Sequence, residues 1–217
     1  MATISFYIGQ FSSTRDAILQ TLHRNPTNIA VAPPFDTFCK KLWPENEPYS
    51  RYFGSWSRHH LLYHLISYER DIALPHFQLW LDGIDDYRKI PGQRQRDARY
   101  NNQATFYDPQ IPVNQLIAEF EQIRRHQLES LQQLSVDHLS DEKETLWGKT
   151  SLDWVLTKTI AHSFEHGTRM YRQAIYWNGS YAVPTLLKQH VEQLLAAGQS
   201  IDMSTYNEFL DFIVTHP

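Results

Sequence analysis

Apolar side chains recur at intervals of three and four residues over long stretches of this chain. Between residues 57 and 81 the recurring positions are Leu61, Leu65, Tyr68, Ile72 and Leu79. At about 100° per residue these positions share one stripe of a helix, which is therefore expected to bury one face. The chain also has only 8 glycines in 217 residues, which argues against an all-β fold with many tight turns. The sequence predicts an all-α fold.

Three further helices are predicted from the same spacing and from the residues at their ends. One covers 13–25 and stops before Pro26, because the residue before a proline disfavours the helical conformation. Another opens at Pro112 and continues to residue 134. The last covers 150–177, where Thr150 and Asp153 are expected to form a capping box.

Two segments between these helices lack a helical pattern. Five prolines between residues 26 and 55 exclude one continuous helix there, and we expect an ordered loop with one helical turn near 38–42. Residues 82–111 are expected to form a second long loop, and a loop of this length in a compact domain usually has a function. The basic run Arg94–Arg99 in it is interpreted as a solvent-facing surface, with a lid as the alternative.

Four helices with long connections assemble most simply into an antiparallel four-helix bundle, here over residues 11–177. A C-terminal helical extension is expected over residues 181–217. A chain of 217 residues is between one and two typical domains long. We predict a single domain covering residues 1–217.

Composition limits the partners of such a chain. Lys and Arg number 20 against 24 Asp and Glu, which gives a net charge of −4. Binding to nucleic-acid phosphates needs a concentrated basic surface, so no nucleic-acid partner is expected. No apolar stretch approaches the ~20 residues that span a bilayer, and residues 1–9 do not resemble a signal peptide. We expect no membrane partner and a cytoplasmic location.

Histidine dominates the side chains that can bind a metal. The chain has 11 histidines and a single cysteine, Cys39. One cysteine cannot form an internal disulfide, and we interpret Cys39 as an unreactive thiol. Any metal ligands should therefore be imidazole and carboxylate groups.

Three histidines on two predicted helices are placed to meet. His162 and His166 are four residues apart, so both rings lie over one patch beside the buried face of their helix. His64 lies at the edge of the apolar stripe of its own helix. Three imidazoles could hold a metal ion and leave positions open for water and substrate. The alternative is that they are hydrogen-bonded without a metal, and His59 and His60 are expected to face solvent.

Polar side chains near these histidines are candidates for proton transfer. Glu69 lies within the apolar arc, where a carboxylate needs a histidine, a tyrosine hydroxyl or an arginine as partner. Tyr68 could line a pocket. The alternatives are an exposed Glu69 and a Tyr68 that only fills the core. Asp71 is a further candidate neighbour of His64, and Glu165 is expected to be solvated.

Two motifs resemble the DinB/YfiT-like superfamily. The stretch Trp56–Leu65 is similar to its second-helix signature, with the tryptophan eight residues before His64. The stretch Thr159–Gly167 is similar to its fourth-helix HxxxH motif, including the glycine after the second histidine. The resemblance covers residues 11–177. It implies a four-helix bundle in which the same three histidines, His64, His162 and His166, ligate a divalent metal.

The resemblance narrows the function without fixing it. Imidazole ligands suit zinc, nickel or iron. Relatives include enzymes that activate a low-molecular-weight thiol for transfer or isomerisation, a helical domain of iron-dependent sulfoxide synthases, and hydrolases assigned from sequence alone. We predict a metal-dependent hydrolase or thiol transferase that acts on a small-molecule substrate, with water or a low-molecular-weight thiol as co-substrate. The alternative is a non-catalytic stress-response or interaction protein, a homodimer with a structural or vestigial metal site.

Overall fold

The computed structural model describes residues 2–24, 26, 28–32 and 56–179. These residues are mostly helical, with one two-stranded sheet. The prediction of a mostly helical fold is confirmed. The predictions for Cys39, for the turn at 38–42 and for the C-terminal helices after residue 181 lie outside the described residues.

The chain divides into two compact units. Unit 1 consists of residues 1–20 and 59–167, and unit 2 of residues 21–58 and 168–217. Within unit 2, the Gln173 amide donates to the carbonyl of Trp56 at 2.8 Å. The single domain over residues 1–217 stays a prediction. Unit 1 contains His64, His162 and His166.

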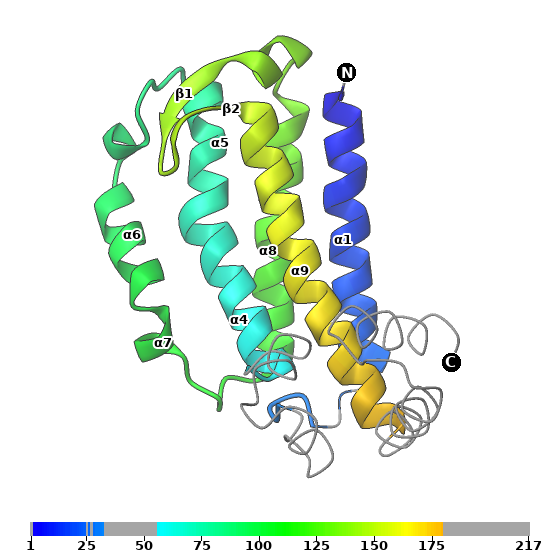
Figure 1. The fold of residues 1–217 in the computed structure, drawn as a ribbon. Coiled ribbons are helices and arrows are strands. Elements are labelled where there is room, and N and C mark those ends of the chain that lie inside the picture. The colour runs from blue at the N-terminus through cyan, green and yellow to red at the C-terminus, as the bar shows by residue number, and fades with distance from the viewer. Residues whose placement is uncertain (1, 25, 27, 33–55, 180–217) are drawn as a thin grey trace, which may run out of the picture. The chain divides into compact units, whose positions relative to one another are not determined.

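Long helices lie side by side in unit 1 (Figure 1). Helix α4 continues through a π-helical turn directly into α5, so the two form one long helical segment. The helices are α1 (Ile4–Arg24), α4 (Arg58–Tyr68), the π-helical turn (Glu69–Ala73), α5 (Leu74–Leu81), α8 (Val113–Gln132) and α9 (Leu152–Gly179). The sequence predicted α8, α9 and the α4–α5 segment, as one helix, within a few residues. It did not predict the π-helical turn or the beginning of α1.

Helix α1 begins at Ile4 and not near Ser13. Ser13 and Thr14 stand where the predicted helix begins. In the structure they are inside α1, and the Thr14 hydroxyl donates to the carbonyl of Gln10 at 2.9 Å. A hydroxyl that donates to a carbonyl of the preceding turn has its hydrogen bond within the helix, so it need not end the helix.

The core of unit 1 is formed mostly by apolar side chains from these helices. Phe11 of α1 packs edge to face on Phe77 of α5, with ring centroids 6.0 Å apart. Burial of each large apolar side chain contributes about 1.5–3 kcal/mol. The buried members of the cluster are Tyr7, Phe11, Phe77, Leu79, Trp80, Ile90, Leu131, Leu134, Leu139, Leu152, Val155 and Leu156.

A β-hairpin precedes α9. Strands β1 (Glu142–Thr145) and β2 (Gly148–Ser151) are antiparallel, and they follow a 3-10 turn (Val136–Ser140). Gly148 has a φ of +89°, a conformation that glycine adopts without strain. The sequence did not indicate this hairpin.

The hairpin changes how α9 begins. Thr150 lies in β2, and its hydroxyl is 3.0 Å from the Thr145 hydroxyl of β1. Ser151 is the residue that caps the helix, because its hydroxyl accepts the Trp154 N–H at 3.3 Å. The predicted capping box of Thr150 and Asp153 is therefore wrong. The cap is one residue later, and the Asp153 carboxylate accepts from the Tyr7 hydroxyl instead.

Residues 82–111 form short helices and not one long loop. They contain a 3-10 turn (Tyr87–Lys89), α6 (Gln93–Asn101) and α7 (Gln103–Phe106). Helix α6 has almost no apolar side chains, so it has no stripe that periodicity could detect. Its position depends on polar contacts with the turn between α4 and α5.

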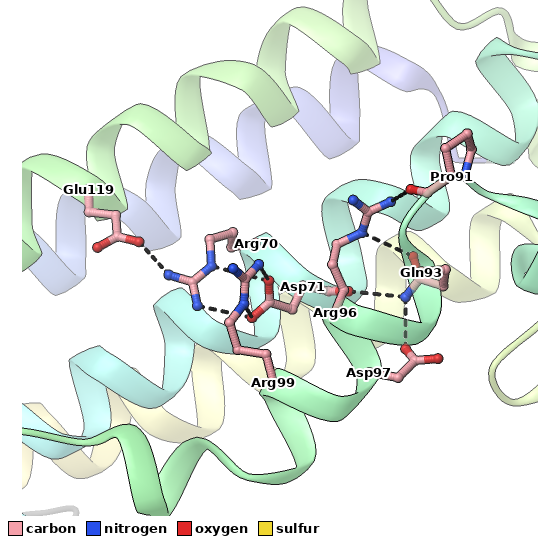
Figure 2. A network of polar contacts seen from close by, with 8 residues as sticks. All are labelled: Arg70, Asp71, Pro91, Gln93, Arg96, Asp97, Arg99 and Glu119. Atoms are coloured by element: carbon pink, nitrogen blue, oxygen red, sulfur yellow. Dashed lines mark hydrogen bonds and ion pairs between the residues drawn. The ribbon is translucent and has the colours of Figure 1, made fainter.

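The first of these contacts is made with the backbone of that turn. Pro75 has no N–H to donate to the carbonyl of Asp71, four residues earlier. That carbonyl accepts a hydrogen bond from the Gln93 side chain of α6 at 3.2 Å (Figure 2). This hydrogen bond attaches the beginning of α6 to the π-helical turn.

The second contact is made with the Asp71 side chain, which is fully buried. Its carboxylate binds Arg70 at 3.0 Å and also Arg99 of α6. Arg70 in turn binds Glu119 of α8 at 2.6 Å (Figure 2). The run Arg94–Arg99 is thus helical. Most of its residues are exposed, as expected of a solvent-facing surface, and Arg99 in addition attaches α6 to the π-helical turn.

His76 of α5 holds the hairpin against the helices. Its Nδ1 is 2.6 Å from the carbonyl of Ile72, and its Nε2 is 3.1 Å from the N–H of Leu146 in the hairpin turn. A carbonyl only accepts and an N–H only donates, so Nδ1 carries the hydrogen and the ring is neutral. Burial lowers the pKa of His76 to about 4.

Stability should therefore fall in mild acid because of His76. Its folded pKa of about 4 is below the ~6.5 of an unfolded histidine. The contribution is complete above about pH 6.5 and is lost as the pH falls toward the folded pKa, by on the order of 2 kcal/mol at about pH 5. Urea unfolding at about pH 7.5 and about pH 5 should show a larger loss in the wild type than in His76→Gln. Equal losses would contradict this role.

Candidate metal centre

Three histidine side chains meet between α4 and α9 in unit 1. His64 comes from α4, and His162 and His166 come from successive turns of α9. The Nε2 of His162 is 3.1 Å from the Nε2 of His64 and 3.2 Å from the Nε2 of His166. One ligand atom from each ring lies within 4.8 Å of the others, and the three could hold a metal ion. The sequence predicted this set.

These separations match the needs of one ion. Nitrogens bound at about 2.0–2.1 Å to a tetrahedral ion lie roughly 3.3 Å apart. Hydrogen bonding explains the same arrangement less well. The Nε2 of His162 has either one hydrogen or one lone pair in a neutral ring, and it cannot serve both neighbouring nitrogens with it. The donor set therefore fits a divalent metal.

The surroundings keep the central ring neutral. Burial, together with the neighbouring His166 and His64, lowers the pKa of His162 to about 2. A metal ligand must present a lone pair, which only the neutral imidazole has. The ring at the centre of the cluster is thus in the required protonation state at neutral pH.

The glycine after the second histidine allows close helix packing. A Cβ on Gly167 would lie 3.1 Å from the Cγ1 of Ile18 in α1. This is closer than ordinary van der Waals contact. Glycine at this position therefore lets α1 pack against the turn of α9 that carries His166.

Tyr68 packs directly on the histidine cluster. Its ring centroid is 4.0 Å from that of His162, and the side chain is buried. Tyr100 of α6 lies beside both, 6.0 Å from the Tyr68 ring and 6.1 Å from the His64 ring. Burial raises the pKa of Tyr68, so its phenol is neutral. Tyr68 is adjacent to the cluster, and its catalytic role stays a prediction.

Glu69 is bound in a buried polar network. Its Oε1 accepts from Nη2 of Arg124 at 2.5 Å and from the Ser163 hydroxyl at 3.0 Å. Arg124, from α8, is fully buried as well. Its guanidinium lies 5.0 Å from the ring centroid of Phe11 and 5.2 Å from that of Phe120. Of the partners that a buried Glu69 was expected to need, the structure provides the arginine.

The charge of Arg124 partly offsets the cost of burying the Glu69 carboxylate. Burial raises the pKa of Glu69, and the charge of Arg124 opposes this rise. Arg124 also donates to the Ser163 hydroxyl at 2.6 Å. Since Ser163 follows His162 in the chain, the network fixes this turn of α9 next to the π-helical turn.

Two further expectations differ from the structure. His59 is buried, with its Nδ1 2.9 Å from the Tyr107 hydroxyl and its Nε2 2.8 Å from the carbonyl of Ile111. The ring of His60 stacks on Tyr107 with centroids 3.9 Å apart. The prediction that both face solvent is wrong, because residues 107–111 cover this end of α4. Glu165 is exposed, as expected.

One neighbour of the cluster was not predicted. The Oε1 of Gln103, the first residue of α7, is 2.8 Å from the Nδ1 of His64. No pattern in the sequence indicated this contact, because residues 82–111 were interpreted as a loop. Asp71, which was a candidate neighbour of His64, instead binds Arg70 and Arg99.

Loss of Arg124 should destabilise the fold strongly. Arg124→Met would leave the buried Glu69 carboxylate without its counter-charge, which typically costs about 3–5 kcal/mol. Arg125→Met, at the exposed next position, should change the unfolding free energy by about 0.5 kcal/mol or less. Urea unfolding measures both.

The double variant Glu69→Gln/Arg124→Met distinguishes loss of the ion pair from loss of side-chain packing. It should lose less stability than the sum of the two single variants, because no charge then stays buried alone. Strict additivity, or an Arg124→Met as stable as Arg125→Met, would contradict the assignment.

Comparison with known proteins identifies the family of this chain. A sequence model of the DinB superfamily matches residues 10–170, which include all three histidines. No curated protein and no solved structure matches the chain significantly. Among the described residues, no helix combines the length and the apolar character that a membrane span requires. Because the match covers well over half of the sequence, the chain belongs to the DinB superfamily.

Proposed function

We propose that this protein is a metal-dependent enzyme whose divalent ion is held by His64, His162 and His166. The ion would sit within an antiparallel four-helix bundle formed by α1, α4–α5, α8 and α9. The convergence of three imidazole nitrogens, two pairs of them 3.1 and 3.2 Å apart, carries the proposal. Zinc, nickel and iron all accept such ligands.

The arrangement is suited to catalysis on a small molecule. A divalent ion in this position would polarise a substrate oxygen and lower the pKa of a coordinated water or thiol. Three protein ligands leave a position for substrate, whereas structural zinc sites usually have four. Hydrolysis, or transfer of a group to a low-molecular-weight thiol, is the proposed reaction class.

Of the two residues predicted for proton transfer, Tyr68 is the better placed. Its neutral hydroxyl belongs to a ring that packs on His162, and it can donate a hydrogen bond to a substrate atom. The Oε1 of Glu69 is already engaged by Arg124 and Ser163. We assign Glu69 to positioning α9 and not to the chemistry.

One observation favours a non-catalytic metal site as the second candidate. The two carboxylates closest to His64 in the sequence of α4–α5, Glu69 and Asp71, are both bound by arginines. Neither carboxylate is therefore free to act as a general base beside His64, and the neutral Tyr68 phenol supplies only a proton donor. In the second candidate the ion only stabilises the helices, and the homodimer predicted from the C-terminal residues 181–217 would be the functional form.

Metal content tests the ligand assignment. Protein purified without an affinity tag should contain about one divalent ion per chain, measured by inductively coupled plasma mass spectrometry. His162→Ala/His166→Ala should lose it, because a single remaining imidazole binds weakly. His126→Ala, an exposed histidine on α8, is the matched control and should keep the ion. Full metal content in the double variant would overturn the assignment.

Turnover separates the two candidates. A screen of esters and thiol acceptors with metal-loaded protein should find a reaction that stops on chelation and that Tyr68→Phe slows by about tenfold or more, since a positioned proton donor contributes at least this much. The variant should retain its metal. Loss of thermal stability on chelation without any turnover would favour the structural site instead.

A further inference from the structure

The contact between Gln103 and His64 defines how His64 faces the cluster. A carboxamide oxygen only accepts hydrogen bonds. The Nδ1 of His64, 2.8 Å from the Gln103 Oε1, therefore carries the hydrogen of the neutral ring. The lone pair is then on Nε2, the nitrogen that lies 3.1 Å from Nε2 of His162. The contact thus selects the tautomer that a metal ligand needs.

We propose that Gln103 is a positioning residue of the metal centre, which fixes the tautomer and the ring orientation of His64. This inference rests on the proposed metal site. Metal-ligating histidines generally donate their other ring N–H to an acceptor, and loss of such an acceptor typically reduces metal affinity 10- to 100-fold. By contrast, the Nδ1 of His162 is buried and has no hydrogen-bond partner among the described residues.

The amide of Gln103 is held from a second side. Tyr100, at the end of α6, lies beside His64 and Tyr68. Burial raises the pKa of Tyr100, and a hydrogen bond with the Gln103 side chain counters part of this rise. Tyr100 is therefore a second neighbour of the Gln103 amide, besides His64.

The position of Gln103 depends on α6, and α6 depends on Asp71. Arg99 binds the Asp71 carboxylate, and Gln93 binds the Asp71 carbonyl at 3.2 Å (Figure 2). Asn102 alone separates α6 from α7, so α6 transmits this attachment to Gln103. The segment that contains α6 and α7 therefore holds Gln103 against His64 from outside the long helices. It does more than connect α5 to α8.

Metal affinity tests the inference. Zinc would be titrated into metal-free protein in competition with a chromophoric chelator, for the wild type and three variants. Gln103→Ala should bind zinc 10- to 100-fold more weakly. Gln95→Ala, which removes an exposed glutamine of α6, should bind as the wild type does.

Gln103→Glu is the decisive variant. A carboxylate has only acceptors, so it keeps the bond from Nδ1 of His64, and its charge makes the imidazole a better ligand. It should bind zinc at least as tightly as the wild type. A purely structural role of Gln103 predicts no such rescue. If the amide N–H donated to His64 instead, glutamate would break the bond and weaken binding as alanine does.

The tautomer can be observed without a metal. Nitrogen-15 NMR of the imidazole rings in metal-free wild type should show His64 protonated on Nδ1, and Gln103→Ala should lose this preference. Equal zinc affinity and an equal His64 tautomer in Gln103→Ala and wild type would overturn the inference while leaving the metal site intact. A wild type that binds no zinc, nickel or iron would overturn the proposed function and the inference with it.

Discussion

The arrangement of unit 1 depends on the buried ion pair between Glu69 and Arg124. Both side chains are fully buried, and an isolated charge in such an interior costs several kcal/mol. The π-helical turn and α8 must therefore meet at this point. Ser163 joins the pair from α9. Ser163 follows His162 in the chain. The hydrogen bond between Ser163 and Glu69 therefore also fixes the position of α9 along its axis, and with it the turn at which His162 faces His64.

The sequence was sufficient for the long helices and the three histidines, because both depend on local spacing. Apolar periodicity predicts α8 without knowledge of its neighbours, and the separation of His162 and His166 places both on one helix face. The remainder depends on contacts between distant segments. No local pattern shows that Arg124 is the partner of Glu69, or that residues 107–111 cover His59. Helix α6 escaped prediction because its stability comes from Asp71 and not from an apolar stripe.

Long helices supply the three proposed ligands, and a polar segment outside them supplies the contact that orients one of the ligands. Helices held by a packed core place side chains more accurately than loops do. The π-helical turn connects the two parts, since Glu69 faces α8 and α9 while Asp71 faces α6. The histidine cluster is thus coupled, through Gln103, to the segment 82–111, for which the sequence predicted only a loop.

X-ray absorption spectroscopy of the zinc-loaded protein tests the central claim most directly, because it reports the atoms bound to the ion. The account predicts three imidazole nitrogens at about 2.0–2.1 Å, with any remaining ligand a light atom from water or substrate. In protein prepared without added thiol, a sulfur neighbour at about 2.3 Å would come from the chain itself and would occupy the position proposed for water or substrate. Fewer than three imidazole nitrogens would contradict the assignment of His64, His162 and His166.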